Sequence, residues 1–181
     1  MQSLRLMEHA LPRGMADKGL PRLKFILVDA LIRHESARSI TMIKQVSLAE
    51  EYLADHFPDF PVLPGVMMLE AAIQAAAWLV REWDQFQHSL VVLKEVRGIR
   101  YGTFVSPGNA LHIQVDVIRL EAMRSEFKIR GSVGQATAIQ GRLELAHKNL
   151  ADSDTNLAAL DQVIIDNMRR RWRELQRSIA A

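Results

Sequence analysis

The sequence predicts an α+β protein in which an antiparallel sheet wraps around one central buried helix. Two observations lead to this fold class. First, one strongly apolar helical segment, residues 66–80, stands between two groups of strand-like segments. Second, the segments at residues 111–120, 125–133 and 138–146 alternate apolar and polar residues, as strands with one buried face do. Two strands precede the helix and four follow it, and a sheet around one helix satisfies this order economically.

The expected elements follow one another without an internal repeat or a low-complexity segment. Residues 25–33 and 39–47 are rich in β-forming residues and predict a first hairpin. Residues 48–57 predict a short helical turn before the central helix. The four strands expected after that helix cover residues 90–101, 111–120, 125–133 and 138–146, with a hairpin turn near Gly134.

Composition indicates one domain with a substantial core, which we expect over residues 1–150. The chain has 181 residues, of which 49% are hydrophobic, and no cysteine. Nothing therefore requires an oxidising compartment or a sulfur-bound metal. The N-terminus lacks the apolar core of a signal peptide, and the most apolar window contains Pro64, Glu70 and Gln74. We expect a cytoplasmic protein without a membrane span.

Positive charge is concentrated at the C-terminus. The formal net charge is +2, and residues 157–181 alone hold five arginines against three acidic residues, which is also +2. The neutral remainder argues against bulk nucleic-acid binding. Residues 151–181 predict a linker and an added amphipathic helix, with apolar residues every three or four positions. This helix either packs on its own domain or a dimer mate, or docks its arginines on an acidic partner or an anionic membrane.

One stretch combines a histidine, a proline-rich loop and a helix with a single carboxylate. It reads HFPDFPVLPGVMMLEAAIQAAA and covers residues 56–77. From Val66 to Val80, thirteen of fifteen residues are apolar, and a helix that is apolar nearly all round is expected to be buried. The exceptions, Glu70 and Gln74, are four positions apart and share one face. Because burying an ionised carboxylate is costly, we expect Glu70 to be paired, hydrogen-bonded or protonated.

The start of this helix adds further groups to a candidate site. Pro64 and Gly65 precede it, and the free N–H groups of a helix N-terminus favour an oxygen that gains negative charge. Glu70 leans toward this end, and His56 lies in the loop that leads there. Such a set suits removal of a proton next to a carbonyl. Each feature alone also fits an ordinary surface histidine, a backbone-bonded glutamate or a Pro-Gly cap.

The joint spacing of these residues resembles the β-hydroxyacyl-acyl carrier protein dehydratases. The shared motif runs from His56-Phe57-Pro58 through Pro61-Val62-Leu63-Pro64-Gly65-Val66 to Glu70 and Gln74. Residues 25–29, FILVD, resemble the first strand of that family. Residues 100–109, RYGTFVSPGN, resemble a later strand and its Pro-Gly turn. The resemblance covers about residues 20–147 and leaves the terminal helix outside.

The resemblance implies a hotdog fold and a homodimer, or a trimer of dimers, with active sites at the subunit interface. It implies dehydration of a (3R)-3-hydroxyacyl thioester to the trans-2-enoyl thioester, in fatty-acid or related polyketide or polyene biosynthesis. The substrate is carried on the phosphopantetheine of acyl carrier protein, which makes that protein a partner. No metal or redox cofactor is implied.

The same resemblance assigns roles within a site shared by two subunits. His56 of one subunit would remove the α-proton, while Glu70 of the other would protonate the leaving hydroxyl. The backbone N–H groups of Gly65 and Val66 would stabilise the oxyanion. The isomerising branch of the family usually has aspartate at the position of Glu70. The resemblance therefore predicts dehydration without movement of the double bond. The supporting residues would be Phe57, Pro64 and Gln74.

The chain departs from the family pattern at Ala30, Asp55, Asp59 and Phe60, which indicates a divergent member with a changed loop around the histidine. The alternative function is a non-catalytic hotdog protein that binds acyl thioesters or docks a partner, and a thioesterase is a third possibility. The presence of both a histidine and a helical glutamate favours the enzyme.

Two arginines near the strand predicted at residues 90–101 allow two interpretations. Arg97 and Arg100 either meet the acidic carrier protein or lie on a solvated strand face.

Overall fold

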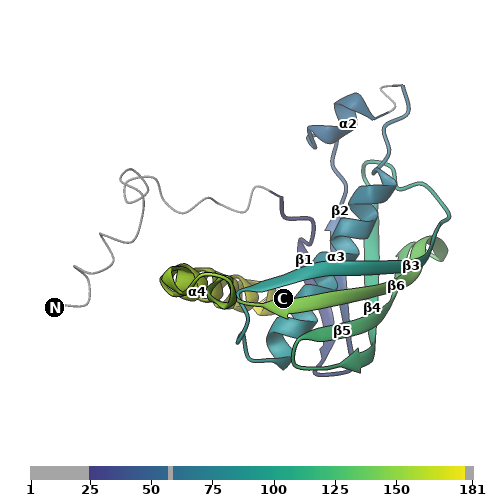
Figure 1. Cartoon of the computed structure of the whole chain (residues 1–181). Helices are drawn as coiled ribbons and strands as arrows, with labels where there is room; N and C mark the ends of the chain where they lie inside the picture. Colours follow the sequence, from purple (N-terminus) through teal and green to yellow (C-terminus); the bar gives the residue numbers. More distant parts are fainter. Residues whose placement is uncertain (1–24, 57–58, 178–181) are drawn as a thin grey trace.

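The computed structural model describes residues 25–56 and 59–177, which form one six-stranded antiparallel sheet with helices packed against it (Figure 1). The strands are β1 (Ala30–Glu35), β2 (Ser39–Gln45), β3 (Leu90–Tyr101), β4 (Ala110–Leu120), β5 (Arg124–Val133) and β6 (Ala136–Lys148). The helices are α2 (Tyr52–Asp55), α3 (Gly65–Trp83) and α4 (Ala158–Arg177), with 3-10 turns η1 (Leu150–Asp152) and η2 (Thr155–Leu157). The predicted α+β class is confirmed.

The sheet has the strand order β1-β2-β4-β5-β6-β3 and curves around α3, as Figure 1 shows. All neighbouring strands pair antiparallel. Because β1 and β3 stand at the two ends of this order, they form the edges of the sheet. The hairpin between β5 and β6 turns at Gly134, whose φ of +55° suits a residue without a side chain. Within the part of the chain that the structure describes, no helix combines the length and apolarity needed to cross a membrane.

Small side chains allow α3 to lie close to the sheet. Ala71, Ala72, Ala75 and Ala76 are at most 1% exposed, and the helix contacts every strand from β2 to β6. Large side chains of the strands fill the remaining space, including Phe127, which is fully buried. A helix that presents methyl groups lets the sheet approach its backbone on several sides without steric overlap.

The other face of α3 is not buried, so the expectation of burial all round is wrong for its N-terminal half. Val66 is 67% exposed, and Glu70, Ile73 and Gln74 are only half-buried in the single chain. The sheet covers the alanine face and leaves this side uncovered. Apolar composition alone therefore overstated the burial of this part of the helix.

The first strand also begins later than residues 25–33 predict. In the preceding segment, the backbone of Phe25 and Leu27 bonds to α3, whereas the Asp29 N–H already donates to the Ile43 carbonyl of β2 at 2.8 Å. The Leu27 N–H donates to Gln74 Oε1 at 2.9 Å, and the Phe25 carbonyl accepts from Gln74 Nε2 at 3.1 Å. Regular strand pairing begins after this stretch, at Ala30.

Helix α4 packs on its own domain, which confirms that alternative for the terminal helix. Trp172 stacks on Trp78 of α3 with ring centroids 5.9 Å apart and an interplanar angle of 22°. The imidazole of His34 on β1 meets the Trp172 indole edge-on, with ring centroids 5.3 Å apart. Met168 and Leu175 are buried in the same core, so α4 extends the hydrophobic core beyond the sheet.

A buried aspartate fixes the start of α4. Asp161 is 5% exposed and accepts hydrogen bonds from the Ser89 hydroxyl and from the N–H groups of Leu150 and Ala151, the latter two at 2.8 and 2.9 Å. Burial by itself would raise the pKa of Asp161. The three donors outweigh burial and hold the pKa below its ordinary value, so the fold stabilises the carboxylate.

We expect Asp161→Asn to lower the free energy of unfolding by about 1–3 kcal/mol at neutral pH, because the variant loses a charged acceptor for buried donors. The folded-state pKa lies below the unfolded value of about 3.9, so this contribution is present above that value and is lost as pH falls through the folded pKa. Urea unfolding of both proteins at neutral pH and at about pH 3 measures the difference. The exposed Asp154→Asn is the matched control. A stability difference that persists undiminished in acid would contradict the assignment.

Candidate active site

The first turn of α3 presents backbone N–H groups at one end of the sheet. Pro64 is the N-cap residue, and its carbonyl accepts from the N–H groups of Met67 and Met68 at 2.9 and 3.1 Å. Gly65 and Val66 come before any intrahelical acceptor, and neither donates a hydrogen bond within the described part of the chain. Two donors with positive helix-dipole character are therefore available where the sequence predicts an oxyanion site.

Gly65 lets an aromatic ring from β3 lie across this turn. A Cβ at position 65 would come within 2.9 Å of Tyr101 Cε1, so any side chain there would displace the ring. The Leu63 N–H also donates to the Val105 carbonyl at 2.8 Å and ties the loop before α3 to the segment after β3. Sequence reasoning missed Tyr101 as a neighbour of the site because only the three-dimensional arrangement brings the two segments together.

Glu70 is held by Gln74, one turn further along α3. Gln74 Nε2 donates to Glu70 Oε1 at 2.9 Å. The amide can have only one orientation, because its oxygen accepts from the Leu27 N–H and its nitrogen faces the Phe25 carbonyl. Oε1 of Glu70 is thus fixed as an acceptor, which leaves Oε2 as the oxygen able to carry a proton. The predicted supporting role of Gln74 has a geometric basis.

His56 lies on a separate segment from this cluster. It is the C-cap residue of α2, is half-buried, and precedes the loop that enters α3. Figure 1 shows α2 beyond the N-terminal end of α3. The structure thus brings together Pro64, Gly65, Val66, Glu70 and Gln74 on one helix and places His56 on the approach to it. The predicted supporting residue Phe57 lies outside the described residues.

Two of the residues that depart from the family pattern lie on the surface of this loop. Asp59 is exposed, and Phe60, 56% exposed, meets Phe104 edge-on with ring centroids 5.8 Å apart. Phe104 and Tyr101 are also largely exposed. These rings and Val66 leave large apolar groups in solvent near the N-terminal end of α3, which is typical of a surface that another protein covers.

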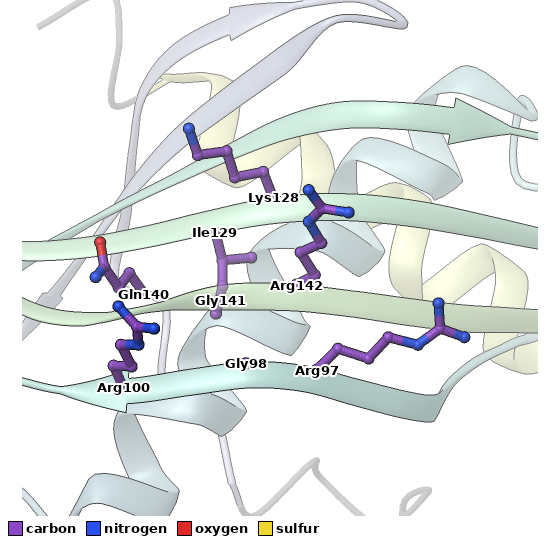
Figure 2. Close-up of a pocket in the computed structure, with 8 residues that line it drawn as sticks. All are labelled: Arg97, Gly98, Arg100, Lys128, Ile129, Gln140, Gly141 and Arg142. Carbon is purple, nitrogen blue, oxygen red and sulfur yellow. The ribbon is translucent and has the colours of Figure 1, made fainter.

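A hollow of about 440 Å³ lies elsewhere, on the face of the sheet turned away from α3 (Figure 2). Arg100, Lys128 and Arg142 project into it from β3, β5 and β6, and none of them forms an ion pair with a described residue. Arg97 at its edge is paired with Glu95 at 2.6 Å. Gly98, with φ of +59°, lies in a register shift of β3 at this place. The hollow is a cationic surface separate from the Glu70 cluster.

A sheet wrapped around a helix whose first turn carries the predicted groups defines a hotdog protein. The dehydratase heterocomplex ApeI:P from Xenorhabdus doucetiae is similar in structure, with a TM-score of 0.57, 22% identity, and coverage of 75% of this chain and 88% of that one. The fluoroacetyl-CoA-specific thioesterase FlK matches with a TM-score of 0.54, 14% identity, and coverage of 69% and 96%. At these identities the likeness shows the fold alone, and it confirms the predicted hotdog fold.

Sequence comparison decides the family. The family model described as ApeI dehydratase matches residues 32–142. The 3-hydroxyacyl-[acyl-carrier-protein] dehydratase FabZ of Albidiferax ferrireducens is 35% identical over 138 residues, which are 74% of this chain and 92% of that protein. The chain therefore belongs to the ApeI-like dehydratase family, with FabZ enzymes among its relatives. The predicted family and its enzyme class are confirmed.

We expect Gln74→Leu to lower kcat by about 10- to 100-fold, because Glu70 loses the hydrogen bond that orients it, and a misplaced acid–base group loses part of its usual 10²–10⁴-fold contribution. Steady-state kinetics and thermal unfolding of the variant measure activity and stability separately. Gln114→Leu is the matched control, since Gln114 is exposed on β4 and bonds at 3.0 Å to Asp116, which is not a residue of the candidate site. Unchanged kcat in the folded Gln74 variant would show that Glu70 does not depend on this amide.

Proposed function

We propose that this protein dehydrates (3R)-3-hydroxyacyl chains on acyl carrier protein to trans-2-enoyl thioesters, in fatty-acid or related polyketide or polyene biosynthesis. The observation that carries the proposal is the Glu70 carboxyl, held by Gln74 in the same helix that presents the Gly65 and Val66 N–H groups. The substrate class is supported by the FabZ relatives, whose names specify 3-hydroxyacyl chains on acyl carrier protein.

The mechanism requires three functions from these residues. Neutral His56 accepts the proton from the carbon next to the thioester carbonyl. The carbonyl oxygen gains negative charge as that proton leaves, and the N–H groups of Gly65 and Val66 stabilise it, an effect commonly worth roughly 3 kcal/mol per donor. Glu70 then gives its proton from Oε2 to the β-hydroxyl, which departs as water while the former C–H electrons form the double bond.

Each step is a proton transfer or the loss of water, so we propose no metal or redox cofactor. The phosphopantetheine that holds the acyl chain belongs to the carrier protein. Product release leaves a protonated His56 and an ionised Glu70, and both are restored when His56 releases one proton to solvent and Glu70 takes one up. The proposed reaction thus balances without a further reactant.

We propose that the active form is a homodimer. Strand β3 is an edge of the sheet, and Val92, Leu93 and Val96 on it are each 37–40% exposed. An edge strand with apolar side chains favours pairing with another chain. Covering this edge and the open face of α3 would remove water from Glu70 and bring in a second subunit's His56. Because the similar ApeI:P dehydratase is a heterocomplex, pairing with a different chain is the outcome to test against.

The acidic carrier protein is the proposed partner, and the cationic hollow is one candidate surface for it. Arg100, Lys128 and Arg142 lack acidic neighbours at ion-pair distance among the described residues, which favours an external anion over a solvated face. Arg97 is already paired with Glu95 and contributes less.

The cytoplasmic location remains a prediction from the sequence.

Incubation with a (3R)-3-hydroxyacyl carrier-protein thioester tests the function. We expect a trans-2-enoyl product by mass spectrometry and no cis-3-enoyl product, and a higher KM for the same acyl group on free pantetheine. His56→Ala and Glu70→Gln should each lower kcat by at least about 100-fold, since general acid–base groups contribute 10²–10⁴-fold. Free thiol as the main product would identify a thioesterase. A substrate that is bound but stays unchanged would support the non-catalytic alternative.

Co-expression of His56→Ala and Glu70→Gln chains tests whether each site is shared between two subunits. A mixed dimer then has one site with both substitutions and one site with neither. With random pairing half of the dimers are mixed, so about one quarter of wild-type activity should return. Mass spectrometry of the intact dimers establishes that mixing occurred. Activity no higher than that of the separate variants would place both groups on one chain.

A further inference from the structure

A second cluster of ionisable side chains lies at the C-terminal end of α3. Asp84 is the C-cap residue of this helix, His88 follows in the turn before β3, and His147 lies near the end of β6. Pairing of β3 with β6 places His147 opposite Val91, three residues after His88. One ligand-type atom from each of the three residues lies within 4.8 Å of the others. Asp84 comes fourteen positions after Glu70, roughly 21 Å along the helix, so this cluster is remote from the candidate active site.

His147 is the feature of the cluster that requires an explanation. The residue is 1% exposed, and neither Nδ1 nor Nε2 forms a hydrogen bond of good geometry with a described residue, although the backbone of Ala122 lies near the ring. Its ring faces that of His88 at 5.7 Å between centroids. A buried polar group without a partner typically costs about 1–3 kcal/mol, so native proteins usually supply a water or an ion at such a place.

The other two residues are already oriented toward a common point. Oδ1 of Asp84 accepts from the Phe86 N–H at 2.9 Å, and a hydrogen bond of 2.8 Å joins Oδ2 to His88 Nδ1. The carboxylate is therefore fixed by the backbone on one oxygen and presents the other to the imidazole of His88. Such outer hydrogen bonds are what orient ligands in known metal sites.

Two imidazoles and one carboxylate form a common ligand set for divalent transition metals. Zinc accepts such ligands at about 2.0–2.2 Å, and tetrahedral ligands then lie roughly 3.4 Å apart. The ligand-type atoms lie within 4.8 Å of one another, and side-chain rotations that replace the Asp84–His88 hydrogen bond would reach this arrangement.

From this geometry we infer that Asp84, His88 and His147 bind one divalent transition-metal ion, with zinc as the probe. The ion joins the end of α3 to the β3–β6 pair and satisfies the buried imidazole. The side chain of His88 is 14% exposed, so the ion can enter the site from the solvent beside it. The positive charge of Arg81 works against a cation at this place, since its guanidinium interacts with the charge of Asp84. Burial lowers the pKa of Arg81 to about 10. The inference is independent of the dehydratase chemistry.

Zinc titration of the full-length protein after chelator treatment tests the inference. We expect one equivalent per chain by calorimetry and a melting temperature that rises with zinc concentration. His88→Ala, at the partly exposed ligand, should weaken binding at least tenfold without leaving a core cavity. His147→Gln should do the same. His112→Ala, at an exposed histidine on β4, is the control and should bind as the wild type does.

Cobalt provides a second readout with the same variants. Tetrahedral Co²⁺ bound to histidine and carboxylate gives visible absorption bands, which should develop in the wild type and the His112 variant and be lost in His88→Ala. Absence of any zinc heat and of any shift in melting temperature would overturn the inference. Binding of equal affinity in His88→Ala would also overturn it, because the metal would then lie elsewhere on the chain.

Discussion

The side-chain amide of Gln74 joins three parts of the molecule that are distant in sequence or function. Its oxygen accepts a hydrogen bond from the Leu27 N–H, and its nitrogen donates to Glu70 Oε1 and to the Phe25 carbonyl. Every polar atom of this amide is used, so neither the glutamate nor the entering chain can move without leaving a half-buried group unpaired. The path of the chain before β1 and the orientation of the Glu70 carboxyl thus involve the same side chain.

The helix that carries this amide has two faces with different tasks. Its alanine face allows the sheet to close around it, while Val66 and Glu70 point to the uncovered side. A fold of this kind provides a rigid frame for a site that one chain covers incompletely. Functional groups on such a frame are positioned precisely by the core, and their access to water is set by what binds on the open side.

Local patterns made most of the fold predictable from the sequence. The apolar, strand-like run at residues 90–101 predicted the boundaries of β3 correctly, and the motif from His56 to Gln74 predicted the family and the candidate residues. The path of the chain before β1 was not predictable, since Leu27 bonds to a residue 47 positions away. The exposure of Val66 was missed because apolarity does not distinguish burial by the same chain from burial by a partner. Tyr101 and His147 acquire their neighbours only through long-range packing and pairing.

The stacked indoles of Trp78 and Trp172 give the protein an internal optical probe. The two rings come from the central helix and from the terminal helix, and they lie nearly parallel at 5.9 Å. Two such chromophores at this separation interact electronically, so near-ultraviolet circular dichroism and tryptophan emission both respond when the rings part. The packing of α4 against the core can therefore be followed in solution without any label, and independently of enzyme turnover.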